Sequence, residues 1–407
     1  MSSEPRLFVI ETHPVQYHAP VYRAVQQQFG IPVTAIYGSD FSVAGYEDTE
    51  FKTFFAWDTD LSAGYDSVFL SRVKQGGAAT AEKVRAGGLR KILKETGDSV
   101  ILLPGYGGPF YRSALLLLWM RKNPLLFRAE TTDHALVRGP LKSWLRDRAL
   151  ERLYRRSAKV LYIGRHSYNH LTRLGCGPEK AVFSPYCVDS SSFQCDEDAR
   201  TRLREATRRT LGVAQEDLVL LFSGKLIPRK APDLIVEAVK LLAAEQRRSC
   251  CVLFMGDGEL RDRIIEAGNT EPRVRTCVLG FQNQRNLSPY FHAADLMILP
   301  SLSETWGLVV NEALHHGVPC VVSEAVGAAP DLIHPNSTGA VCGSGSASSL
   351  AAAITSVLPL LRRYDTRQAC RKTVGSYGIT EAARGIAQAF HSVMEMRSHP
   401  ETVSQSA

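Results

Sequence analysis

The sequence predicts an α/β protein made of two doubly wound domains. Short apolar segments of strand length alternate with longer amphipathic segments along most of the chain. This alternation is typical of mainly parallel sheets covered by helices on both faces. A chain of 407 residues also exceeds the usual size of one hydrophobic core, so two domains are expected. The expected strands of the first half are residues 7–10, 33–37, 100–103, 125–128, 160–163 and 181–184.

The second half repeats the alternation from about residue 218 to residue 341. A polar stretch at residues 189–198 separates the two halves and marks a domain boundary. A last helix is expected near residues 380–396, and residues 398–407 have the composition of a frayed end. The predicted division is therefore residues 1–188, residues 189–378, and a helix at residues 379–397.

The composition is that of a globular protein, with 44% hydrophobic and 22% charged residues. The longest apolar run, residues 114–120, is far shorter than the roughly 20 residues that span a bilayer. The first residues lead directly into a strand and contain no hydrophobic signal core. The nine cysteines have no C-x-x-C spacing, which indicates reduced core thiols and no zinc site. We therefore expect a cytoplasmic protein without a bound metal.

Two carboxylates eight positions apart are the most informative feature of the second half. Glu304 and Glu312 lie between a buried strand that ends at Pro300 and a helix end at Gly317. Glu304 is expected in a loop, and Glu312 in the helix that follows the loop. Ligands of open α/β sheets bind beyond the carboxyl ends of the strands, where helix N-termini attract anions. The segment therefore predicts a site into which a diphosphate would fit.

A basic turn lies earlier in the same half. An apolar strand runs into Gly224, which is followed by Lys225, Arg229 and Lys230. Cations beside a turn of this kind can neutralise phosphate oxygens, although each alone would also fit a solvated turn. A second glycine turn, at residues 256–258, lacks the third glycine of a dinucleotide-binding fingerprint. A dehydrogenase is therefore not expected.

Together these segments resemble the retaining glycosyltransferases of the GT-B fold, in particular glycosyltransferase family 4. The acidic segment is similar to the family's E-x7-E signature, and the basic turn is similar to the family's phosphate-binding turn. The resemblance implies that Glu312 holds the ribose hydroxyls of a nucleotide-sugar and that Glu304 lies beside the transferred sugar. It also implies that Lys225 and Lys230 neutralise the leaving diphosphate. By the same resemblance, the two domains face each other across a cleft, and the helix at residues 379–397 crosses back to the first domain. The implied catalytic residues are Glu304, Lys225, Lys230 and His134, and the implied donor-binding residues are Glu312, Gly224, Arg229, Gly256, Phe281, Thr305, Trp306, Gly307 and Leu308.

The first domain is expected to bind the acceptor of the sugar. The turn after its first strand carries His13, Gln16 and Tyr17, which either face the cleft or pack locally at the start of a helix. A glycine-rich loop that includes Gly107 follows another strand and can bring backbone N–H groups close to a ligand. This loop lacks the Lys-Ser/Thr of a P-loop, so nucleotide triphosphate hydrolysis is not implied.

A third loop, at residues 128–134, follows the next strand. Its place resembles that of the family's acceptor loop, which implies that Asp133 or His134 contacts the transferred sugar. A histidine in such a loop also fits a purely structural role.

The net charge of +7 is concentrated between Arg112 and Lys180. The densest part, residues 141–156, predicts a basic amphipathic helix. Such a helix either lies on an anionic membrane surface or is an ordinary domain helix with a basic solvent face. No recognition motif or stacking aromatics accompany the cations, so nucleic acid is not an expected partner. The residues expected to share the apolar face of this helix are Leu141, Trp144, Leu145, Leu150 and Leu153.

By this resemblance, the chain transfers a sugar from a UDP- or GDP-linked donor to a hydroxyl of a saccharide or lipid-linked acceptor, with retention of anomeric configuration. In such enzymes the leaving diphosphate draws the acceptor proton, so positioning and charge stabilisation carry the catalysis and no cofactor is required. The setting implied is bacterial surface-polysaccharide assembly on the inner face of the membrane. A non-catalytic nucleotide-sugar-binding protein and a GT-B sugar-nucleotide epimerase are the alternative interpretations.

Overall fold

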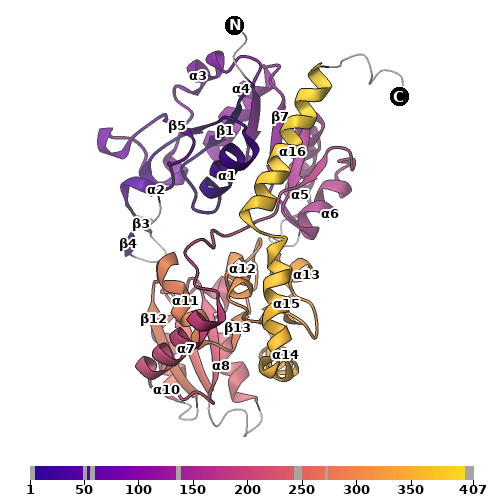
Figure 1. Cartoon of the computed structure of the whole chain (residues 1–407). Coiled ribbons are helices and arrows are strands. Elements are labelled where there is room, and N and C mark those ends of the chain that lie inside the picture. The colour runs from indigo at the N-terminus through magenta and orange to yellow at the C-terminus, as the bar shows by residue number, and fades with distance from the viewer. Residues whose placement is uncertain are drawn as a thin grey trace.

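The chain folds into two lobes, each built around a parallel sheet (Figure 1). The chain crosses between the lobes near residue 190 and again near residue 378, just before the last helix. The computed structural model describes residues 5–48, 53–55, 60–133, 139–242, 250–270 and 274–398.

The first domain contains a seven-stranded sheet in the order β5-β2-β1-β6-β7-β8-β9. All its strand pairs are parallel. The central strands are buried on both faces, which explains their continuous apolar sequences. All six strands predicted for this half are formed. The strands are β1 (Leu7–Glu11), β2 (Val33–Tyr37), β5 (Asp66–Phe69), β6 (Val100–Leu103), β7 (Leu125–Ala129), β8 (Lys159–Tyr162) and β9 (Ala181–Phe183), and the hairpin β3 (Tyr46–Asp48) with β4 (Thr53–Phe55) lies apart from the sheet.

Helices cover both faces of this first sheet. The first helix and the last helix of the chain share one hydrophobic cluster, while α3 to α6 contribute to the cluster on the other face. The helices are α1 (Ala19–Phe29), α2 (Phe41–Ala44), α3 (Leu89–Glu95), α4 (Gly108–Trp119), α5 (Pro140–Arg156) and α6 (Arg165–Arg173), with 3-10 turns η1 (Val73–Gln75) and η2 (Ala81–Lys83).

The second domain contains a six-stranded parallel sheet in the order β12-β11-β10-β13-β14-β15. Its strands are β10 (Leu218–Ser223), β11 (Cys250–Met255), β12 (Val274–Gly280), β13 (Leu296–Leu299), β14 (Cys320–Ser323) and β15 (Gly339–Cys342). Its helices are α7 (Glu197–Leu211), α8 (Asp233–Lys240), α10 (Arg261–Asn269), α11 (Leu287–Ala293), α12 (Leu308–His315), α13 (Ala329–Leu332), α14 (Ala347–Val357) and α15 (Tyr364–Gly375), with 3-10 turns η3 (Pro228–Lys230), η4 (Gln284–Asn286) and η5 (Leu358–Arg362).

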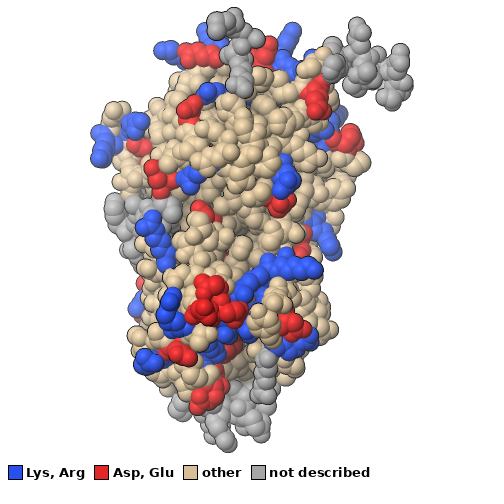
Figure 2. All heavy atoms as spheres, in the orientation of Figure 1, with Lys and Arg blue, Asp and Glu red and all other residues tan. Residues whose placement is uncertain are grey.

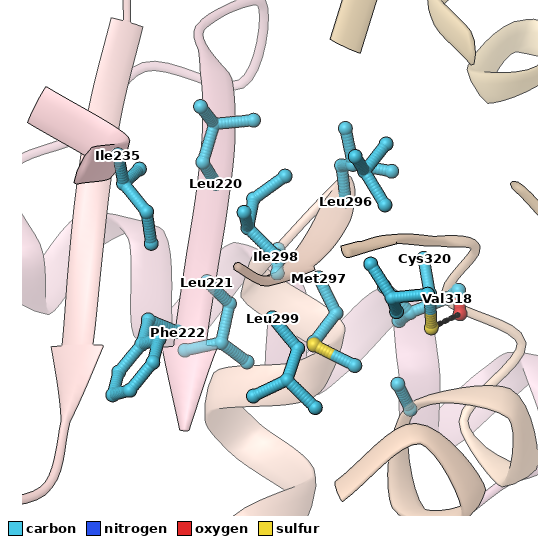
Figure 3. Close-up of a cluster of buried hydrophobic side chains, with 14 of the residues drawn as sticks. Leu220, Leu221, Phe222, Ile235, Leu296, Met297, Ile298, Leu299, Val318 and Cys320 are labelled. Carbon is cyan, nitrogen blue, oxygen red and sulfur yellow. Dashed lines mark hydrogen bonds between the residues drawn. The ribbon is translucent and has the colours of Figure 1, made fainter. Parts of the chain in front are cut away.

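The core of the second domain lies between the neighbouring strands β10 and β13 and the helices that cover them. Figure 3 shows Leu220 and Phe222 of β10 with Ile298 of β13 and Ile235 of α8, all of them fully buried. The residues of these strands are almost all apolar, so binding groups are expected at the carboxyl ends of the strands and in the loops that follow them.

The last helix, α16 (Ile379–Ser398), packs on α1, β8 and β9 of the first domain, whereas α15 packs on α12 of the second (Figure 1). The Ser184 hydroxyl donates a hydrogen bond to the carbonyl of Ala382, at 2.9 Å. A Cβ atom on Gly385 would lie 2.0 Å from the carbonyl oxygen of Phe183. Only glycine therefore lets α16 approach the edge strand β9 this closely.

One prediction about α5 was wrong. Leu150 and Leu153 are buried, but Leu141, Trp144 and Leu145 are 69%, 55% and 55% exposed. Leu150 follows Leu141 by about two and a half helical turns and therefore lies on the opposite side of the helix. The five apolar residues do not share one face.

Acidic and basic side chains are interspersed over the face of the molecule that carries α1 and α16 (Figure 2). Among the described helices, none is both long enough and apolar enough to cross a membrane.

Candidate functional site

Two cavities meet at Tyr17, in the cleft between the domains. The larger one, of about 550 Å³, is lined mainly by loops after β1, β6 and β7, and is called the first-domain cavity. The smaller one, of about 330 Å³, lies at the carboxyl edge of the second sheet and is called the second-domain cavity. Because Tyr17 lines both, a ligand group in one cavity can approach a group held in the other.

Two glycines form the floor of the second-domain cavity where β10 and β11 end. The backbone N–H of Gly224 donates to the carbonyl of Met255, at 2.9 Å. A Cβ atom on Gly256 would lie 1.9 Å from the carbonyl oxygen of Gly224. The strand ends can therefore approach each other this closely only because residue 256 lacks a side chain. This leaves backbone groups open to the cavity.

Lys230 and Glu304 form an ion pair in the wall of this cavity. Their side chains are largely buried. The loop that carries Glu304 is held by two backbone hydrogen bonds, from its N–H to Ala325 at 3.2 Å and from the N–H of Gly327 to its carbonyl at 3.1 Å. The ammonium group is therefore fixed in position, which favours charge stabilisation of an anionic ligand.

Glu312 points a buried carboxyl group into the same cavity from α12. Gly307, with φ of 96°, begins this helix and turns the chain away from the Glu304 loop. Burial raises the pKa of Glu312 to about 8. No residue in the described part of the chain donates a hydrogen bond to its carboxylate. Buried acids of this kind are suited to accept hydrogen bonds from ligand hydroxyl groups.

Tyr17 connects the acidic residues to the first domain. Burial raises the pKa of its hydroxyl well above the ordinary value, and the nearby carboxylates of Glu312 and Glu304 raise it further. Tyr17 is therefore neutral at physiological pH, with its hydroxyl available as a hydrogen-bond donor.

The raised pKa of Glu312 predicts a specific dependence of stability on pH. A carboxyl group whose pKa is 4.5 when unfolded and about 8 when folded favours folding below pH 4.5, and this contribution is lost as the pH rises toward 8. Glu312→Gln should therefore match the wild-type melting temperature near pH 4.5 and exceed it above pH 8. Melting curves of both proteins across this range provide the measurement, and equal melting temperatures above pH 8 would contradict the assigned pKa.

The first-domain cavity contains a hydrogen-bonded row of three ionisable side chains. Nδ1 of His18 lies 2.5 Å from Oε1 of Glu11, and Nε2 of His18 lies 3.1 Å from Oε1 of Glu130. Burial lowers the pKa of His18, but its two carboxylate partners outweigh burial and raise it to about 9. His18 is therefore an imidazolium that donates to both carboxylates. Glu11 is buried, whereas the Glu130 side chain is 31% exposed, so Glu130 presents the accessible carboxylate.

Arg128 and Tyr186 complete this wall of the cavity. The Arg128 guanidinium lies 5.2 Å from the centre of the Tyr186 ring and donates to the carbonyl of Pro185, at 3.0 Å. Burial raises the pKa of Glu130, but the hydrogen bond and charge of His18, together with the charge of Arg128, outweigh burial and lower it. Glu130 is therefore ionised at neutral pH and can accept hydrogen bonds from a ligand hydroxyl.

Most of the sequence-predicted site residues lie around these cavities. The second-domain cavity is lined by Gly224, Lys230, Gly256, Phe281, Glu304, Gly307, Leu308 and Glu312, and by Gln16 and Tyr17 from the first domain. The first-domain cavity is lined by His13, Tyr17, Gly107 and Thr305. Gln16 also joins the domains, because its Nε2 donates to Oε1 of Gln284, at 2.5 Å.

Four of the predicted residues that the structure describes line neither cavity, namely Lys225, Arg229, Asp133 and Trp306. Lys225 follows the cavity residue Gly224 directly and is half-buried. Arg229 donates to the carbonyl of Ser303, at 3.0 Å, and so braces the Glu304 loop. The Asp133 carboxylate lies 2.8 Å from both His170 and Arg173, outside the cavity. His134 lies outside the described residues.

Trp306 is turned away from the second-domain cavity and lies in the contact between the domains. Its ring stacks on Tyr377 with centres 5.7 Å apart, and its Nε1 donates to Oδ1 of Asn311, at 2.9 Å. A Cβ atom on Gly164 of the first domain would lie 2.4 Å from this ring. Trp306 therefore positions the site loop through packing.

Sequence reasoning missed Glu11, His18, Glu130, Arg128 and Tyr186 as cavity residues. A usable signal existed for two of them, because Glu11 and Glu130 stand at or just after the carboxyl ends of β1 and β7. Within the described part of the chain, no group of three or more His, Cys, Asp or Glu side chains is placed to hold a metal ion.

Part of the second domain matches a known protein family. Residues 204–373 match the family described as glycosyl transferases group 1. The chain is 29% identical over 241 residues to a D-inositol 3-phosphate glycosyltransferase of Geodermatophilus obscurus, covering 54% of this chain and 49% of the relative. It is 35% identical over 160 residues to one of Mycobacterium marinum, covering 38% of this chain and 33% of the relative. The chain thus spans about half or less of the length of these curated relatives.

Solved structures resemble the whole chain. Anabaena HepE in complex with UDP and glucose superposes with a TM-score of 0.66 at 16% identity, covering 96% of this chain and 100% of that one. Sucrose-phosphate synthase from Thermosynechococcus elongatus superposes with a TM-score of 0.68 at 18% identity, covering 96% and 99%. At such identities the likeness concerns the fold, and it confirms the predicted GT-B architecture. The chain thus has the GT-B fold, and residues 204–373 of its second domain are similar to the glycosyl transferases of group 1.

Proposed function

We propose that this chain is a retaining glycosyltransferase that moves a hexose from a nucleotide-sugar to a hydroxyl of a saccharide or lipid-linked acceptor. The observation that carries the proposal is the convergence of Glu312, the Lys230–Glu304 pair and Tyr17 on one cavity of about 330 Å³. This cavity adjoins a second one large enough for a sugar acceptor.

The donor binds in the second-domain cavity in this proposal. The Glu312 carboxyl group accepts hydrogen bonds from the ribose hydroxyls, and Lys230 lies on the side of the diphosphate. Gly224 and Gly256 let the diphosphate approach the backbone, since neither carries a side chain. We propose a UDP- or GDP-linked donor, and the complexes of HepE with UDP and with UDP-glucose favour UDP.

In the transfer step, the bond between the anomeric carbon and the diphosphate oxygen breaks while the acceptor oxygen bonds to the same face of that carbon. The acceptor proton passes to the departing diphosphate, so the step balances without a protein nucleophile. Lys230 stabilises the negative charge that develops on the leaving group. Lys230 supplies the positive charge in the proposed mechanism, and we propose that no metal is required.

Glu130 is the residue we propose for holding an acceptor hydroxyl, because its ionised carboxylate faces the first-domain cavity. Glu130→Gln should raise the acceptor KM about tenfold, since a hydrogen bond to a charged group would be weakened, while the Kd of the donor stays unchanged. Steady-state kinetics with UDP-glucose and a panel of hexoses and inositol phosphates provide the measurement. Glu95→Gln, an exposed acid of the same domain, is the control. An unchanged acceptor KM would remove Glu130 from this role.

One assay separates this function from the two alternatives. Free nucleotide and sugar products are followed after incubation with UDP- and GDP-sugars, with and without the acceptor panel. Acceptor-dependent nucleotide release with an unchanged anomeric configuration in the product, read from NMR coupling constants, supports a retaining transferase. Binding without release would identify a nucleotide-sugar-binding protein, and a changed sugar without a transfer product would identify an epimerase.

The setting we propose is surface-polysaccharide assembly in the cytoplasm, at the inner face of the membrane. A structural neighbour, WaaG, is involved in lipopolysaccharide biosynthesis. WaaG superposes on this chain with a TM-score of 0.62 at 14% identity, which supports a shared fold only. The cellular setting therefore stays a prediction from the sequence.

A further inference from the structure

The solvent side of α5 carries apolar residues where a helix surface is normally polar. Leu141, Trp144 and Leu145 are all more than half exposed, and their spacing of three and four places them on one side of the helix. Exposed arginines continue the same row toward the end of the helix. The row, called the α5 stripe, consists of Leu141, Trp144, Leu145, Arg148, Arg152 and Arg155.

The neighbouring helix α4 repeats this pattern. Leu116, Trp119 and the adjacent Met120 are 67%, 52% and 72% exposed. Both helices pack on the same face of the first sheet, and the Arg156 guanidinium of α5 donates to the carbonyl of Arg121 just after α4, at 2.6 Å. The exposed residues of α4, with Met120, and the α5 stripe are together called the α4–α5 surface.

We propose that the α4–α5 surface docks on an anionic lipid membrane. Exposed leucines and tryptophans insert at the boundary between headgroups and acyl chains, and arginines beside them attract lipid phosphates. No acidic residue occurs between positions 104 and 129. In α5, Glu151 is paired with Arg148 at 3.2 Å and Asp147 with Arg173 at 2.7 Å. The surface therefore combines apolar contact with positive charge.

The positive charge of the α4–α5 surface favours an anionic membrane over a second copy of the chain as its binding partner. A symmetric dimer through this surface would bring the same arginines of two copies toward each other, and like charges across an interface are costly. An anionic bilayer provides the complementary charge and accepts the apolar side chains at the same time.

The α4–α5 surface lies next to the proposed acceptor cavity, and the role of docking described here rests on the proposed function. Arg146, on the same helix, lines the first-domain cavity and donates to the carbonyl of Thr132, at 3.2 Å. The apolar first turns of α5 thus lie beside the proposed acceptor cavity. Docking through them would bring the cavity to the membrane surface, where a lipid-linked hydroxyl is found.

Vesicle sedimentation tests the proposal without requiring transferase activity, so its outcome is independent of the proposed function. The full chain is mixed with vesicles of equal parts phosphatidylcholine and phosphatidylglycerol, and the sedimented fraction is measured at low and high salt. The wild type should sediment, less so at high salt because exposed charges are screened. The triple variant Leu141→Ser, Trp144→Ser, Leu145→Ser should partition at least about tenfold more weakly. These three residues are exposed, so the triple variant should keep the fold. Equal melting temperatures of the triple variant and the wild type would show that it does.

The matched control changes two exposed apolar residues of the second domain, Leu241→Ser and Tyr364→Ser, and should sediment like the wild type. Wild-type protein that stays in the supernatant at low salt overturns the proposal, and so does a triple variant that sediments equally well. A dimer in analytical ultracentrifugation that the triple variant abolishes would assign the surface to a second copy instead.

Discussion

Lys230→Ala is expected to lower kcat about 10²-fold, the range seen when one preorganised group that stabilises transition-state charge is removed. The ammonium group is held in the cavity wall by Glu304, so it needs little reorganisation when charge develops on the leaving diphosphate. The Kd of the donor should change much less than kcat, because the diphosphate gains charge only as the bond breaks. Single-turnover kinetics and calorimetric titration of UDP separate the two quantities.

The control for this prediction is Lys240→Ala. Lys240 also forms an ion pair with a glutamate, Glu237, at 3.2 Å, in the same domain but outside both cavities. Its loss should leave kcat unchanged. If Lys230→Ala keeps wild-type kcat while melting normally, Lys230 does not act on the leaving group.

Glu312→Ala is expected to raise the Kd of the nucleotide donor at least about tenfold, because the ribose hydroxyls lose the buried group that accepts their hydrogen bonds. The carboxyl group is buried in the wall of the cavity, so water replaces it poorly. Titration of UDP and of free uracil nucleoside provides the measurement, since both carry the ribose and only UDP carries the diphosphate. The affinity of both ligands should fall by a similar factor.

Glu259→Ala, at an exposed acid after β11, is the control and should leave both affinities unchanged. Unchanged affinity in Glu312→Ala would exclude Glu312 from the nucleotide site. A loss confined to UDP would show that Glu312 acts through the diphosphate and not through the ribose.

Strands and the second-domain cavity could be predicted from the sequence because their signals are local. Buried parallel strands such as β6 are continuous apolar runs, and the segment from Glu304 to Glu312 carries both of its acids within one loop and helix. The edge strand β5 was missed since its residues alternate between exposed and half-buried positions and its sequence is short.

The charged row of the first-domain cavity could not be predicted in the same way. Glu11, His18 and Glu130 come together only because β6 alone separates β1 from β7 in the sheet, and Glu130 is 112 residues from His18 in sequence. Strand order is a property of the folded sheet, so the sequence pattern of each strand carries no sign of this contact. The orientation of the Trp306 side chain likewise depends on Tyr377, which is distant in sequence and stacks on the Trp306 ring only in the folded protein.

For α5 too, some features could be predicted from the sequence and others could not. Its helical form and positive charge follow from residues 141–156, but the division of its leucines between core and solvent depends on where the sheet lies. The structure buries Leu150 and Leu153 and leaves Trp144 exposed. The exposed apolar residues therefore became recognisable only once the packing was known.

A crystal structure of the protein with bound UDP would test the proposed nucleotide site most directly. We expect the ribose hydroxyls within hydrogen-bond distance of the Glu312 carboxylate, and the diphosphate beside Gly224 and Lys230. A nucleotide bound in the first-domain cavity, or one whose ribose faces away from Glu312, would contradict the proposed donor site.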